Sequence, residues 1–276
     1  MSRKRGVGLF RHMLCIDLKR CLRSVRFWTI VLSIGILTLI GETGYGTDLL
    51  LFFRGYDTSE GIVELLTSSL MFDRFKVVYV ILLSSIYTGS FCREETSGNL
   101  RMILARVDIT DYTQSKFIAN TLGIITAAIF SFFCFTLALI PHRALASHNY
   151  ANSGYHYLYI MEQHPLWYIF MVGLEFGMIV AAFSAMGMLF SVYQSNLFVS
   201  IGLPGLLFFA LASVDLPNSP FDVYQMISMG HTLTRGGGDN VWIDYGWGLL
   251  FPFLVILLCG RLFYQRLRWR LKNGLI

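Results

Sequence analysis

Charged side chains gather in one interior stretch of a chain that is otherwise strongly apolar. The stretch is "CREETSGNLRMILARVDITDYTQSK", residues 92–116, and it lies between two long apolar runs. Its charged side chains are Arg93, Glu94, Glu95, Arg101, Arg106, Asp108, Asp111 and Lys116. Mixed charges of this density are typical of a helical segment that stands in water. We therefore expect a solvated loop between the two apolar runs.

An apolar stripe runs through the same stretch. It follows the i, i+3, i+4, i+7 spacing of one helical face and consists of Leu100, Ile103, Leu104 and Val107. Residues 97–99, "SGN", supply turn and N-cap chemistry before this helix. Glu94 and Glu95 precede its N-terminus, where the helix dipole favours acids. A short helix with one apolar stripe needs a surface that covers it, either the bilayer or a groove on a partner protein.

One acidic residue, Glu175, lies inside a long apolar run, residues 166–193. An ionised carboxylate is costly in hydrocarbon, so acids within membrane spans are candidates for function by default. Glu175 could line a translocation path, or it could pair with a polar group from another helix. The sequence leaves both interpretations open.

Motifs for nucleotide binding and catalysis are absent from the sequence. It contains no G-x-x-x-x-G-K-[ST], the loop that cradles ATP phosphates, and its glycine cluster "RGGGDN", residues 235–240, has no following lysine. It also contains no G-x-S-x-G, and no aspartate within an apolar run, as an intramembrane enzyme would need. We therefore expect no catalytic residues, no cofactor in this chain and no enzymatic activity of its own.

Metal-ligating side chains do not occur at ligand spacings. The five cysteines form no C-x-x-C pair. Four histidines between residues 141 and 165 are spaced by six, eight and eight positions, whereas helical ligands need i, i+4. We expect neither a metal site nor a disulfide framework.

The composition indicates what surrounds the charged stretch. Of 276 residues, 55% are hydrophobic and 14% are charged, and the mean hydropathy is +0.57. Soluble domains carry about 25% charged residues, and runs of about 20 apolar residues cross a bilayer as α-helices. We predict an all-α, polytopic membrane protein with six spans, at residues 27–40 with an extension beyond, 70–91, 117–140, 166–193, 197–214 and 246–264.

Basic residues are distributed unequally between the two sides that six spans define. Residues 1–26, 92–116 and 261–272 together hold seventeen of the 22 Lys and Arg. Basic segments stay on the cytoplasmic side of a membrane. We therefore expect a multi-pass protein of the cell (cytoplasmic) membrane, with both termini and the charged stretch in the cytoplasm.

Residues 9–25, "LFRHMLCIDLKRCLRSV", form a basic amphipathic pattern. One helical face is apolar and contains Phe10, Leu14, Leu18, Cys21, Leu22 and Val25. The other face carries Arg11, Lys19, Arg20 and Arg23. Such a helix lies in the membrane interface; the alternative is an ordinary basic segment that only sets topology.

Two motifs resemble those of the permease subunits of type-2 ABC exporters (the ABC-2 type). Those subunits begin with an interfacial elbow helix that ends roughly E-x-K-R-x-x-R-S, and here residues 17–24 read "DLKRCLRS". After the second span they carry E-x-x-x-G-T-x-x-x-L-x-x-P-V-S, then Tyr and Lys. The chain matches this pattern at Glu94, Gly98, Leu100, Ile103, Leu104, Val107, Tyr112 and Lys116. Asn99 replaces the usual Thr, and the proline is absent.

The resemblance implies a single transmembrane permease domain, residues 1–276, with an elbow helix at 9–25, a cytoplasmic coupling loop at 92–116 and an outer loop at 215–245 that holds a re-entrant helical pair. It implies that the coupling loop contacts a separate ATPase through Glu94, Glu95, Gly98, Leu100, Ile103, Leu104 and Val107. Two ATPase copies would bind the ATP and Mg, and a second permease, identical or similar, would complete the complex without nucleic acid.

The function that follows from the resemblance is ATP-driven export. Because the predicted interior is apolar and aromatic, we expect an amphipathic substrate: a peptide, such as an antimicrobial peptide, an antibiotic or a lipid-like molecule. The alternative is an ATP-independent channel or secondary carrier. Carriers usually show several intramembrane charges and repeated halves, whereas this sequence offers one glutamate and no evident repeat.

Overall fold

The computed structural model describes residues 3–43, 61–72, 76–146, 163–212 and 241–274. Every regular element within these ranges is a helix, which confirms the predicted all-α class. The helices are α1 (Arg3–Leu22), α2 (Val25–Thr43), α4 (Ile62–Phe72), α5 (Lys76–Ser85), α6 (Ser90–Thr96), α7 (Asn99–Leu104), α8 (Ile109–Leu139), α10 (Pro165–Tyr193), α11 (Leu197–Ala212) and α13 (Val241–Lys272).

Three described helices are long and apolar enough to cross a membrane: α8, α10 and α13. Residues Phe10–Leu22 and Val25–Ile40 form a fourth candidate, a pair of helices bent by 50°. Such a bend fits an interfacial helix followed by a span as well as one broken span, so the elbow stays a prediction. The apolar helices Lys76–Ser85 and Leu197–Leu211 are shorter. The chain is thus built for embedding in a membrane, and the total of six spans stays a prediction.

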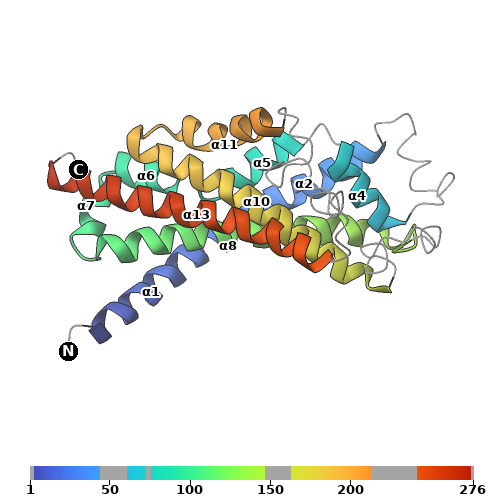
Figure 1. The fold of residues 1–276 in the computed structure, drawn as a ribbon, viewed down its shortest axis with the longest axis horizontal. Helices are drawn as coiled ribbons and strands as arrows, with labels where there is room; N and C mark the ends of the chain where they lie inside the picture. The colour runs from blue at the N-terminus through green and yellow to red at the C-terminus, as the bar shows by residue number, and fades with distance from the viewer. Residues whose placement is uncertain (1–2, 44–60, 73–75, 147–162, 213–240, 275–276) are drawn as a thin grey trace.

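The helix α10 forms the centre of the bundle. It packs against α8, α13 and α11, and 78% of its most apolar window is buried, against 28% for α13. In Figure 1, α13 runs along α10 for most of its length. The outward face of α13 exposes Leu254, Leu257 and Leu258, as expected of side chains that meet lipid.

Both chain ends lie at the same end of the bundle as α6 and α7 (Figure 1). The predicted arrangement, with the termini and the charged stretch on one side, agrees with this. The side of the membrane that this end faces stays a prediction.

The short helix α4 was not expected from the sequence. It is almost fully buried through Ile62, Val63 and Leu66, and its first two backbone N–H groups donate to the carbonyls of Ala144 and Leu145 after α8. Most of the predicted outer loop 215–245, including its re-entrant pair, lies outside the described residues; residues 241–245 form the first turn of α13.

Glycine allows α10 to approach α8 closely. A Cβ at Gly177 would lie 2.8 Å from Ile125 Cα, which no flexible side chain can relieve. Small residues at helix interfaces permit such contacts in membrane bundles.

Gly177→Ala should therefore lower the thermal unfolding temperature in detergent, because α8 and α10 must separate at a cost of about 1–3 kcal/mol. The matched control is Gly202→Ala in α11, where an added Cβ meets nothing within 4 Å. It should leave the unfolding temperature unchanged or raise it. Equal unfolding temperatures for the two variants would contradict the close packing of α8 and α10.

Candidate functional site

A buried ionic cluster joins α1, α6 and α8 around Lys116, whose side chain is 1% exposed. Its ammonium Nζ donates to Asp17 Oδ1 at 3.1 Å, to Glu94 Oε1 at 2.6 Å and to the Tyr87 hydroxyl at 3.0 Å. An ammonium has three donors, and each of them has an acceptor here. We call these residues, with Tyr112 and Ser115, the Lys116 cluster.

The remaining carboxylate oxygens of the Lys116 cluster also accept hydrogen bonds. The Tyr112 hydroxyl donates to Glu94 Oε2 at 2.8 Å, and Ser115 Oγ donates to Asp17 Oδ2. Lys116 Nζ lies 5.3 Å and 5.5 Å from the ring centroids of Tyr87 and Tyr112, within cation–π range. Burying charge is costly unless every partner is satisfied, and here both carboxylates and the ammonium are.

A second ion pair ties α6 to the opposite side of the bundle. Glu95 accepts from Arg270 of α13 and from Ser195, which follows α10. Arg270 Nη1 also donates to the Val192 carbonyl at 3.0 Å. The adjacent acids Glu94 and Glu95 therefore bind different halves of the structure, because successive side chains on a helix point about 100° apart.

A left-handed residue connects α6 to α7. Gly98 has φ +73°, and its N–H donates to the Glu95 carbonyl at 3.0 Å while the N–H of Ser97 donates to that of Arg93 at 3.0 Å. Glycine is the residue that adopts this conformation without steric cost. The predicted N-cap before α7 is thus made by backbone geometry, and no side chain caps α7.

The apolar stripe of the charged stretch is partly covered by the chain itself. Leu100 is 1% exposed, and Ile103, Leu104 and Val107 pack against the core. Leu100 thus packs within this chain, and the expected contact of the stripe with a partner stays a prediction. The opposite face of α7 and the following turn is the exposed one, and it consists of Asn99, Arg101, Met102, Ala105 and Arg106.

Polar side chains also meet farther into the bundle. Thr88 and Asn120 both hydrogen-bond to Ser184 of α10, which joins three segments at one point. Cys92 Sγ lies 3.1 Å from Ser200 Oγ of α11.

Glu175 lies apart from both ionic sites. It is 5% exposed, and its Oε2 has no hydrogen-bond partner among the described residues. A Cβ at Gly248 of α13 would collide with this carboxylate, so Glu175 fills the space that Gly248 leaves. Among the described residues, no group of three or more His, Cys, Asp or Glu side chains could hold a metal ion.

The structure brings together most of the polar residues that the resemblance singled out. Asp17, Glu94, Tyr112 and Lys116 meet in one cluster, although they are up to 99 positions apart. Sequence reasoning missed Tyr87 and Arg270, because neither belongs to a motif that the sequence displays.

Comparisons with known proteins add no relative. No protein-family model matches the chain, and no curated protein matches it. The resemblance to ABC-2 permeases therefore stays a prediction that rests on the matching residues of the sequence.

Replacing Lys116 by Met should destabilise the protein strongly, because the buried carboxylates of Asp17 and Glu94 would lose their counter-charge. Breaking a buried ion pair on one side costs about 3–5 kcal/mol. The measurement is thermal unfolding in detergent by tryptophan fluorescence. Arg101→Met removes one exposed positive charge from the same segment and should change the unfolding temperature little. Similar, small effects of both substitutions would refute the structural role of the Lys116 cluster.

Proposed function

We propose that the chain is the membrane subunit of an ATP-driven exporter of the ABC-2 type, with six spans, both termini in the cytoplasm and a location in the cell membrane. The observation that carries this proposal is the Lys116 cluster. Asp17, Glu94, Tyr112 and Lys116 stand at the motif positions of that family, and in this chain they hydrogen-bond to one another.

On this proposal α6 and α7 form the coupling element. Glu94 attaches α6 to Lys116 of α8, which in turn binds Asp17 of α1, and Glu95 attaches α6 to α13. A force on the exposed face of α7 would therefore reach both sides of the bundle. Because breaking a buried ion pair costs about 3–5 kcal/mol, these helices would move together with α6 rather than let it slide past them.

The force has a direct path toward the bundle interior. The turn before α6 contains Thr88, which hydrogen-bonds to Ser184 in the buried middle of α10. Cys92, which lies in α6 itself, contacts Ser200 of α11. A rotation of α6 would thus move α10 and α11, the helices that would border an export route for an amphipathic substrate.

The partners follow from the same proposal. Two ATPase copies, which bind ATP and Mg, would dock on the exposed residues Arg101, Met102 and Arg106, while the stripe beneath them anchors α7 to this chain. A second permease, identical or similar, would complete the route.

The first test is co-purification of the tagged chain in mild detergent with the ABC ATPase encoded beside it. Arg101→Glu with Met102→Asp should abolish the complex and the ATPase stimulation in nanodiscs, because both side chains are exposed on α7. Lys272→Glu with Asn273→Asp, at exposed positions at the C-terminal end of α13, is the control and should retain both. Absence of any complex with the unmodified protein, or its survival in the α7 variant, would contradict the proposal.

A buried carboxylate favours a second function, that of an ATP-independent channel or secondary carrier. Glu175 is the acid in the middle of α10 whose Oε2 has no partner among the described residues. A carboxylate in such a place can exchange protons with a transported species.

Proteoliposomes with an imposed pH gradient and no ATP distinguish the two functions. Under the main proposal, protein-containing and empty vesicles should lose the gradient at the same rate, as followed with an enclosed pH dye. A faster loss that Glu175→Gln restores to the empty-vesicle rate would favour the channel or carrier. Ser191→Ala, at another buried polar position of α10, is the matched control.

A further inference from the structure

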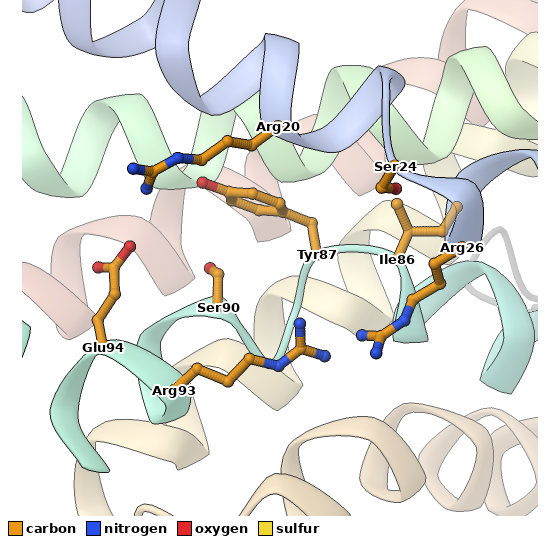
Figure 2. A pocket seen from close by; sticks show the side chains of 8 residues that line it. All are labelled: Arg20, Ser24, Arg26, Ile86, Tyr87, Ser90, Arg93 and Glu94. Carbon is orange, nitrogen blue, oxygen red and sulfur yellow. The ribbon is translucent and has the colours of Figure 1, made fainter. Parts of the chain in front are cut away.

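An arginine-lined cavity lies at the bend between α1 and α2. Its volume is about 380 Å³, and it opens between this bend and residues 86–94. Three arginines line it: Arg20 of α1, Arg26 of α2 and Arg93 of α6. Figure 2 shows the side chains of Arg26 and Arg93 extending toward each other from opposite walls.

These arginines lack counter-charges within the described part of the chain. None of the three guanidinium groups forms a hydrogen bond or ion pair there. The acid in the wall is Glu94, whose two oxygens already accept from Lys116 and Tyr112. The cavity therefore holds three arginine charges without an ion-pair partner and one carboxylate, Glu94, that already binds Lys116 and Tyr112.

The proximity of the arginines has an electrostatic cost. The pKa of Arg93 is lowered, first by partial burial of its guanidinium and then by the positive charge of Arg26. An anion between the two would remove this repulsion. The hydroxyl of Ser90, which also lines the cavity, is buried and has no partner among the described residues, so a donor is available for such an anion.

The position of the cavity indicates where the anion comes from. It lies where the basic helix α1 gives way to the apolar helix α2, whose outer face exposes Trp28, Leu32 and Ile36. Exposed tryptophan and basic residues at the start of an apolar helix mark the level of the lipid headgroups. Arginine forks match phosphate oxygens geometrically, and basic pockets between helices bind anionic headgroups.

We infer that the cavity lined by Arg20, Arg26, Arg93 and Ser90 binds a phosphate group. Two sources share this chemistry, namely the headgroup of an anionic phospholipid and a free phosphate compound. This inference does not rest on the proposed export function. A phosphate group in the cavity would connect the α1–α2 bend to α6.

The test measures binding to the full chain in a neutral detergent by native mass spectrometry. The probes are short-chain phosphatidylglycerol, short-chain phosphatidylcholine and glycerol phosphate, each titrated separately. We expect one saturable site for phosphatidylglycerol and at least tenfold weaker binding in Arg26→Gln with Arg93→Gln. Ser90→Ala, which changes no charge, should weaken binding several-fold in a protein that folds normally.

Arg101→Gln with Arg106→Gln is the matched control, because both arginines belong to the same charged stretch and do not line the cavity. It should bind phosphatidylglycerol within twofold of the unmodified protein. Glycerol phosphate binding as tight as that of phosphatidylglycerol would assign the site to a free phosphate compound; much weaker binding would assign it to the lipid. Equal losses in the cavity variant and the control, no binding of either anionic probe, or an unchanged Ser90→Ala would overturn the site.

Discussion

The burial of one ammonium group, that of Lys116, constrains the end of the bundle where α1, α6 and α8 meet. Lys116 is 1% exposed, and a buried ammonium is stable only where acceptors surround it. The chain supplies the acceptors from three separate segments, with Asp17 from α1, Glu94 from α6 and Tyr87 from the turn before it. If these segments moved apart, a charge would become exposed to solvent or would stay buried without a partner. The need to satisfy the Lys116 ammonium therefore holds both α1 and α6 against α8.

The neighbouring acid extends the constraint to the other half of the bundle. Glu95 follows Glu94 directly, yet it pairs with Arg270 of α13. The seven-residue helix α6 is therefore fixed at two points about 100° apart around its axis. Gly98 then turns the chain so that Leu100 of α7 packs into the core. The same geometry explains how the charged stretch meets both water and the core: its charges face water or one another, while Leu100 is buried and Ile103, Leu104 and Val107 are partly buried.

The sequence predicted those parts of the fold whose signal is long and local. Helices α8, α10 and α13 follow from apolar runs that no soluble helix would carry. The eleven-residue helix α4 is too short to show a period, so it was missed. At the site, Glu94 and Lys116 could be found by motif, whereas the partnership of Glu95 with Arg270, 175 positions away, is a tertiary contact that no local pattern encodes. The apolar stripe shows a further limit, because periodicity indicates that a face is covered but not which surface covers it.

Glu94 belongs to two features that the sequence alone did not reveal, the Lys116 cluster and the arginine-lined cavity. Both of its carboxylate oxygens accept hydrogen bonds within the Lys116 cluster, and the residue also lines the arginine cavity. Without an anion, the arginine charges that line the cavity also lie near this carboxylate, although only Lys116 pairs with it. An anion bound to Arg26 and Arg93 would leave Glu94 to Lys116 and Tyr112, and would thereby strengthen the attachment of α6 to α8. If the anion is a lipid headgroup, the strength of the contact between α6 and α8 would depend on the charge of the surrounding membrane. The lipid would act through Glu94 without contacting it.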